Sequence, residues 1–266
     1  MIIQMTDLAR DALHRANIAV SAAALTAVRP IYRNIGTRPD HLGTVTFVEV
    51  DGVDYILTAA HVVDHHEAHT LYIGHRRLQD ITLTFRMTAA PDGVRSNDRW
   101  DFAFAKADSI WREHGIIPLD ISQLPALDDA MILTAVGYPN SANRKIDHQF
   151  RRIRPTQRRY ASLRLPSDHP IYAALPIAHN THVAISRDSR YAMSDGKRVS
   201  TFEPRGMSGG VFFGMPNVQR AAVVVFGGEP TIFPAGLIIE KNDQHRALFG
   251  PALSVIADQI RAQSIR

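Results

Sequence analysis

Short β-rich runs separated by turn residues occupy most of the 266-residue chain, and this pattern limits the folds that it can adopt. Residues 44–58 contain two such runs joined by Asp51-Gly52, a dipeptide that strongly favours a two-residue hairpin turn. Residues 101–107 alternate with a period of two, which predicts a strand with one buried face. Many short strands at modest spacing are typical of β-barrels and β-sandwiches. Further strands are predicted at 70–75, 81–87, 130–139, 182–186, 210–214, 221–228 and 235–242.

Both ends of the chain depart from this pattern and favour helices. Residues 6–28 predict an amphipathic helix packed on the domain, with Thr6 as its cap. The run 18–28 also resembles the core of a secretory signal, but it is rich in alanine and poor in leucine. Residues 29–43 predict a loop, and residues 251–264 predict a closing helix with a proline in its first turn. One face of that closing helix carries Leu253, Ile256, Ala257 and Ile260.

The composition fits an ordinary globular protein, with 45% hydrophobic and 21% charged residues. The chain has no cysteine, which excludes disulfides, thiolate metal sites and a cysteine nucleophile. The lack of cysteine fits a reducing compartment, so we expect a cytoplasmic protein, with export as the alternative. No apolar run is long enough to span a bilayer, and the net charge of +4 is compatible with an anionic partner.

Three separate segments carry side chains suited to nucleophilic catalysis. A β run ends in small residues just before His61, Asp101 begins the alternating strand, and Ser208 lies among glycines in residues 206–210. A serine hydroxyl needs a base to take its proton, and histidine titrates in the right range. A carboxylate would fix the tautomer of that histidine, and glycines leave main-chain N–H groups free to stabilise an oxyanion. A plain glycine-rich turn is the alternative for the serine, and Asp98 is a second candidate carboxylate.

The segments "TAAH", "DFAFAK" and "GMSGG", in this order, resemble those of the trypsin-like (chymotrypsin-fold) serine proteases. The segments "GTVTF" and "AVGYP" resemble strands of the bacterial branch of this family. The resemblance covers about residues 43–242. It implies an all-β fold of two six-stranded antiparallel Greek-key barrels with the active site between them. It also implies that His61 is the general base, Asp101 its orienting carboxylate and Ser208 the nucleophile. The main-chain amides of Gly206 and Ser208 would form the oxyanion hole, and no cofactor is implied.

This resemblance predicts four parts of the chain. They are an N-terminal helix and loop (1–42), a first barrel with the histidine and aspartate (43–115), a second barrel with the serine (116–250) and a C-terminal helix (251–266). The boundary between the barrels is expected within the linker 112–128.

The chain also departs from the family pattern. Members that are activated by cleavage have an aspartate where this chain has Met207, so activation of that kind is not expected. The resemblance implies a specificity pocket with no acidic residue at its base, which favours a small or medium apolar side chain at the cleavage site. The predicted lining residues are Phe202, Val225, Phe226 and Gly227.

Two other segments suggest alternative functions. Within the histidine-rich run 61–69, residues 66–69 are one residue short of the H-E-x-x-H zinc motif. Residues 61–65 have aspartate where the inverted motif, H-x-x-E-H, has glutamate, so no metal site is predicted. The basic segment 143–164, with Arg151, Arg152 and Arg154, could bind an acidic partner or nucleic acid. We expect a protein or peptide substrate, with acidic segments as one option, and neither nucleic acid nor membrane as a partner. A catalytically silent binding module on the same fold is the other alternative, and the sequence does not predict an oligomeric state.

Overall fold

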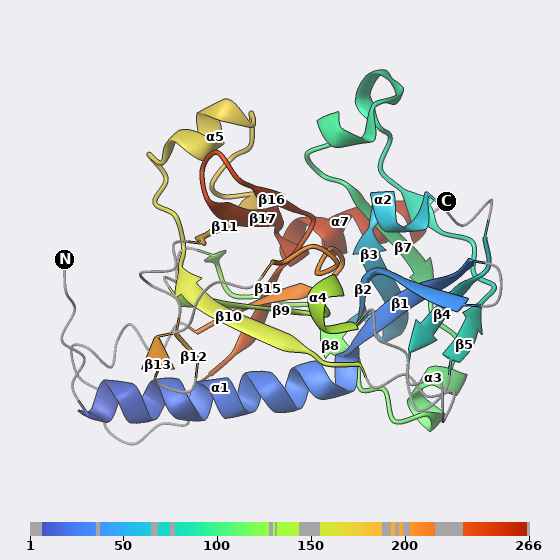
Figure 1. The fold of residues 1–266 in the computed structure, drawn as a ribbon, viewed down its shortest axis with the longest axis horizontal. Coiled ribbons are helices and arrows are strands. Elements are labelled where there is room, and N and C mark those ends of the chain that lie inside the picture. The colour runs from blue at the N-terminus through green and yellow to red at the C-terminus, as the bar shows by residue number, and fades with distance from the viewer. Residues whose placement is uncertain are drawn as a thin grey trace.

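The fold is described by a computed structural model with three β-sheets, a long N-terminal helix along the lower edge of the view and a C-terminal helix near its centre (Figure 1). Strands dominate and their pairing is almost entirely antiparallel, so the prediction of an all-β fold with two terminal helices is confirmed. In the part of the chain that the structure describes, no helix is long and apolar enough to cross a membrane. The described residues are 7–35, 38–64, 69–74, 78–127, 130, 132–143, 155–187, 193–194, 197–198, 203–215 and 231–264.

The first sheet has eight strands in the order β5-β4-β1-β2-β3-β7-β6, with β8 paired in parallel to β2. The predicted hairpin is confirmed, because β2 and β3 pair across Asp51-Gly52. Both turn residues have positive φ angles, 50° and 80°, as a tight hairpin turn requires. The strands are β1 (Val28–Ile35), β2 (Arg38–Val50), β3 (Val53–Ala59), β4 (Leu71–Gly74), β5 (Leu78–Ile81), β6 (Arg86–Met87), β7 (Phe102–Lys106) and β8 (Leu119–Asp120).

The second half contains a six-stranded sheet, ordered β13-β12-β10-β9-β14-β15, and a three-stranded sheet, ordered β11-β17-β16. Single bridges, Arg164 to Ile185 and Gly236 to Ala252, join the two sheets. The expectation of six strands in each half is therefore wrong. The strands are β9 (Ile132–Gly137), β10 (Arg158–Leu163), β11 (His182–Ser186), β12 (Met193–Ser194), β13 (Lys197–Arg198), β14 (Val211–Gly214), β15 (Phe233–Leu237), β16 (Glu240–Asn242) and β17 (Ala247–Pro251).

The helices cover the sheets and close the core. From Ala16 to the end of α1, every third or fourth residue is fully buried, as an amphipathic helix requires. The predicted apolar face of the closing helix is buried in α7. The buried residues of α1 are Ala16, Val20, Ala24 and Ala27. The helices are α1 (Asp7–Ala27), α2 (Ala60–Val63), α3 (Ile110–Glu113), α4 (Asn140–Asn143), α5 (Pro170–Ala174) and α7 (Leu253–Ser264), with short 3₁₀ turns η1 (Pro91–Gly93) and η2 (Arg95–Asn97).

Three predictions of local structure need correction. Residues 29–43 form β1 and the start of β2 rather than a loop, because β1 pairs on both edges and buries Ile31 and Tyr32. Strand β7 is buried on both faces, since its alternation is between phenylalanine and alanine and not between apolar and polar residues. The strand expected at 81–87 is split between β5 and β6. The strand expected at 221–228 lies outside the described residues, and the domain boundaries stay a prediction.

Candidate active site

His61 lies in α2, the four-residue helix that directly follows β3. The first N–H groups of a helix lack partners within it. Here Asp101, which lies 40 residues after His61 in the chain, supplies an acceptor for each of the first two N–H groups of α2. Its carbonyl accepts from the N–H of Ala60 at 2.9 Å, and its Oδ1 accepts from the N–H of His61 at 3.0 Å. The main chain of α2 is thus fixed to the residue that faces the imidazole.

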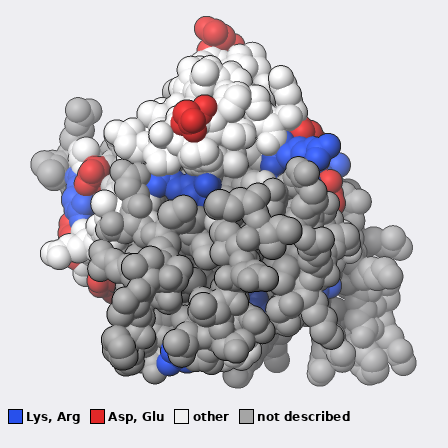
Figure 2. All heavy atoms as spheres, turned by 90° about the vertical axis from the view of Figure 1, so that its left-hand side faces the viewer, with Lys and Arg blue, Asp and Glu red and all other residues white. Residues whose placement is uncertain are grey.

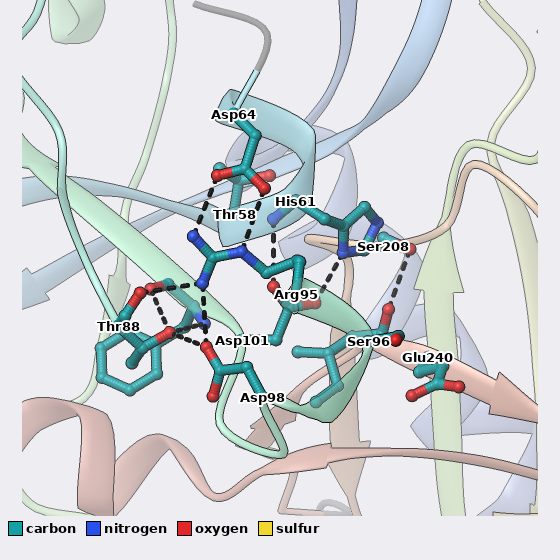
Figure 3. Close-up of polar contacts among 12 residues, drawn as sticks. Thr58, His61, Asp64, Thr88, Arg95, Ser96, Asp98, Asp101, Ser208 and Glu240 are labelled. Carbon is teal, nitrogen blue, oxygen red and sulfur yellow. Dashed lines mark hydrogen bonds and ion pairs between the residues drawn. The ribbon is translucent and has the colours of Figure 1, made fainter. Parts of the chain in front are cut away.

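The imidazole and the carboxylate also meet directly (Figure 3). His61 Nδ1 lies 2.6 Å from Asp101 Oδ2. Because an ionised carboxylate only accepts hydrogen bonds, Nδ1 carries the proton and Nε2 of the neutral ring is left as an acceptor. The Asp101 side chain is 8% exposed and that of His61 is 40% exposed, so the buried group orients the accessible one.

The surroundings of Asp101 oppose its charge and hold its main chain. Burial raises the pKa of the Asp101 carboxyl, while the hydrogen bonds from His61 lower it. Its φ angle of 36° lies in the left-handed region, which costs about 1–2 kcal/mol for most residues other than glycine. The hydrogen bond from Ala60 to the Asp101 carbonyl and the bonds from His61 to the Asp101 carboxylate hold this conformation.

The competing carboxylate, Asp98, has other partners. Its Oδ2 accepts from Arg95 Nη1 at 3.0 Å and from the Thr88 hydroxyl, and its Oδ1 accepts from the N–H of Trp100. The structure thus brings Asp101, and not Asp98, to His61.

Ser208 lies in a loop of the second half that hydrogen bonds to the first sheet. The Thr44 hydroxyl donates to the Gly206 carbonyl at 3.0 Å, and the Thr46 hydroxyl donates to the Gly209 carbonyl at 2.9 Å. The N–H of Thr44 donates to the Ser208 carbonyl at 2.8 Å. Both threonines are fully buried on one face of β2. They were missed by sequence analysis, because the carbonyls that they contact lie 162 and 163 residues away in the chain.

Two glycines in the loop have conformations that other residues adopt with strain. Gly206 and Gly209 have φ angles of 93° and 89°. A Cβ atom at Gly206 would collide with the side chain of Asn140, and one at Gly209 would collide with the carbonyl of Thr44. The glycines thus allow the serine loop to approach the first sheet closely.

The main-chain amides of the loop fall into two groups. The N–H groups of Met207, Gly209 and Gly210 donate to main-chain carbonyls. Among the described residues, the N–H groups of Gly206 and Ser208 have no protein acceptor. The two free amides are those at which the oxyanion hole was predicted. The Arg205 carbonyl, which precedes the N–H of Gly206, accepts from the N–H of Asn140 at 2.7 Å.

The serine loop and α2 are neighbours. A Cβ atom at Gly43 would touch both the Val62 side chain and the Ser208 carbonyl, so both segments pack on the same point of β2. Figure 3 draws Ser208 and the imidazole of His61 together. The Ser208 hydroxyl donates to the Ile239 carbonyl at 3.0 Å, so its proton is directed at the main chain and not at the imidazole.

The segment that passes Ser208 continues into β16, an edge strand that begins at Glu240. The Glu240 carboxylate lies 3.5 Å from Arg99 Nη1, and burial raises the pKa of Glu240. Lys241 pairs with Glu203 at 2.9 Å. These charges next to the serine loop were also missed by sequence analysis. The predicted pocket residues Phe202, Val225, Phe226 and Gly227 lie outside the described residues.

The alternative sites receive no support from the described residues. No group of three metal-ligating side chains occurs among them, and residues 65–68 of the histidine-rich run lie outside them. Arg151, Arg152 and Arg154 of the basic segment also lie outside. On the face shown in Figure 2, the described acidic and basic side chains are interspersed and do not form a patch of one sign.

Comparisons with known proteins identify the fold. No family model matches the sequence, and neither does any curated protein sequence. Among solved structures, the VesB protease of Vibrio cholerae matches with a TM-score of 0.51 and 17% identity, over 90% of this chain and 64% of that chain. A serine endoprotease from Yersinia pestis matches with a TM-score of 0.50 and 14% identity, over 98% of this chain and 67% of that chain. At these identities the likeness concerns the fold alone, and this chain has the fold of the trypsin-like serine proteases.

Proposed function

We propose that this protein is a serine endopeptidase that hydrolyses peptide bonds through an acyl-enzyme. The observation that carries the proposal is the 2.6 Å contact between His61 Nδ1 and a buried Asp101 carboxylate, next to a serine loop with two free amides. This contact leaves Nε2 of the imidazole as the base, and the fold supports the same class of enzyme.

The proposed reaction uses each group in turn. Ser208 Oγ attacks the peptide carbonyl while His61 Nε2 takes its proton, and Asp101 stabilises the imidazolium that forms. The N–H groups of Gly206 and Ser208 stabilise the negative oxygen of the tetrahedral intermediate. The imidazolium then protonates the leaving amine, and the C–N bond breaks. Water deprotonated by the same imidazole hydrolyses the ester and regenerates the serine.

The hydroxyl of Ser208 must change partner before the first step. Its bond to the Ile239 carbonyl is a neutral hydrogen bond, which contributes about 1 kcal/mol net. Breaking this bond therefore costs about 1 kcal/mol before the hydroxyl can donate to the imidazole.

Labelling with a serine-directed phosphonate tests the proposal. We expect stoichiometric labelling of the wild-type protein at Ser208, and none in Ser208→Ala or in His61→Ala. Ser109→Ala is the control, because the Ser109 hydroxyl is exposed next to α3 and donates to the Asp108 carboxylate, away from His61. A folded wild-type protein that is not labelled, or labelling that persists in His61→Ala, would indicate a binding module instead of an enzyme.

Substrate selection is proposed from the sequence. The residues Phe202, Val225, Phe226 and Gly227 favour a small or medium apolar side chain at the cleavage site, and Arg151, Arg152 and Arg154 favour acidic segments nearby. Profiling a peptide library with wild-type protein and Ser208→Ala tests the first preference. Unchanged cleavage of acidic peptides after all three arginines are replaced by glutamine would remove the second.

A further inference from the structure

An ion-pair network with one buried carboxylate, Asp98, and one exposed carboxylate, Asp64, lies next to the His61–Asp101 pair (Figure 3). It is not used in the proposed reaction. Its centre is Arg95, in the 3₁₀ turn η2 between β6 and β7. Nε and Nη2 of Arg95 donate to both carboxylate oxygens of Asp64 at 3.0 and 2.9 Å. Nη1 donates to Asp98 Oδ2 at 3.0 Å and to the Thr88 carbonyl at 2.8 Å. The guanidinium is one-fifth exposed.

The two carboxylates belong to the two segments that carry the proposed catalytic pair. Asp64 directly follows α2, and its N–H donates to the Ala60 carbonyl at the other end of that helix. Asp98 is 3% exposed and accepts from the N–H of Trp100, the residue before Asp101. One guanidinium thus joins the C-terminal end of the histidine segment to the loop that presents the aspartate.

The short length of α2 explains why such a link is needed. A helix of four residues has no independent stability, so its orientation depends on its tertiary contacts, which are the buried side chains of Val62 and Val63 and the hydrogen bonds at its two ends. Asp101 holds the first end through two N–H groups, and the fork of Arg95 holds the other end through Asp64. A bidentate arginine–carboxylate pair fixes direction as well as distance, which a lysine ammonium would not do.

The network also compensates a charge close to Asp101. Burial raises the pKa of Asp101, and the nearby Asp98 carboxylate adds to that rise. Arg95 neutralises Asp98 through a pair in which the carboxylate is almost fully buried. Loss of the guanidinium would leave Asp98 with an uncompensated charge in the interior.

We propose that Arg95 is a positioning residue, which holds α2 and the Asp101 loop in the arrangement that lets His61 Nδ1 donate to Asp101. It does this through Asp64 and Asp98, which belong to the two segments that carry the pair. The inference deepens the proposed function and rests on it, because the held pair is the proposed general base and its partner.

The kinetic test compares Arg95→Gln with a matched control, Arg112→Gln. Arg112, which lies in α3, forms the same kind of fork on Asp54 and also pairs with Glu49. We expect Arg95→Gln to lower kcat by about 10- to 100-fold with KM changed less than about 2-fold, because small displacements of a catalytic group have effects of this size. Arg112→Gln should change kcat less than about 2-fold, and Arg95→Lys should restore only part of the loss. Equal effects of the two glutamine variants, or an effect on KM alone, would overturn the inference.

A spectroscopic test separates this inference from the proposed function. The proton on His61 Nδ1 gives a downfield proton NMR resonance, which its loss in His61→Ala identifies. We expect Arg95→Gln and Asp64→Asn to shift or broaden it, and the double variant to change it no further. Arg112→Gln should leave it unchanged. If Arg95→Gln does not fold, Asp64→Asn gives the same test with a side chain of equal size. An unmoved resonance in a folded variant contradicts the role of Arg95, whereas a wild-type protein with the resonance but no phosphonate labelling contradicts only the proposed function.

Discussion

Replacement of Thr44 by valine should show how strongly the first sheet holds the serine loop. The Thr44 hydroxyl donates to the Gly206 carbonyl and accepts from the N–H of Tyr138, both at 3.0 Å and both in the buried interior. Valine has nearly the same shape, so no cavity forms and the change removes only the two hydrogen bonds.

The expected loss of stability follows from the groups left behind. A buried donor or acceptor without a partner costs about 1–3 kcal/mol, and two are created here. The extra methyl group recovers about 0.8 kcal/mol of burial. We therefore expect Thr44→Val to lower the free energy of unfolding by about 1–5 kcal/mol, measured by urea denaturation.

Thr134→Val is the matched control. Thr134 is equally buried in β9, but within the described part of the chain its hydroxyl has no hydrogen-bond partner. Its replacement should therefore leave stability unchanged or raise it by about 1 kcal/mol. The reasoning is refuted if Thr44→Val lies within about 0.5 kcal/mol of wild type, or if the two valine variants lose the same amount.

Three further predictions follow from the site. Asp101→Asn should retain the fold but lower kcat by about 10⁴-fold, because asparagine favours the wrong tautomer of the histidine; a loss below 10-fold in peptide hydrolysis would contradict this. Gly209→Ala should lower the free energy of unfolding by at least about 3 kcal/mol, because it combines a positive φ angle with a collision. Gly52→Ala, with a positive φ angle in open space, should lower it by about 1–2 kcal/mol. Equal losses of the two variants in urea denaturation would contradict the collision. Burial lowers the pKa of His182, so its stabilising effect is complete above the unfolded value near 6.5 and is lost as pH falls through the folded value. Unfolding measured at pH 7.5 and 5.5 should show a smaller difference for His182→Gln than for wild type, and an unchanged difference would reject this assignment.

The sequence predicted the parts of the site that depend on local patterns. His61 and Ser208 each lie where a β run meets small residues, and Asp101 begins an alternating strand, so each could be found within a few residues of chain. The Asp51-Gly52 hairpin was found for the same reason. The pairing of His61 with Asp101 came from the resemblance, and the structure confirms the contact.

The parts that were missed depend on partners far away in the sequence. The hydroxyl of Thr44 bonds to a carbonyl 162 residues later, and nothing near Thr44 in the chain indicates it. Strand β1 contains arginine, proline and asparagine, yet it is a strand because β2 and β4 pair with its two edges. Arg95 is one of many arginines in the sequence, and only the fold shows that Asp64 and Asp98 lie on both sides of it.

The intact mass of the protein, measured after acid quenching during turnover of an activated peptide ester, tests the central claim most directly. We predict a population that carries one acyl group on Ser208, located by peptide mapping, and its absence from Ser208→Ala and His61→Ala. Turnover by a folded wild-type protein without this adduct, or an equal adduct in Ser208→Ala, would contradict the account.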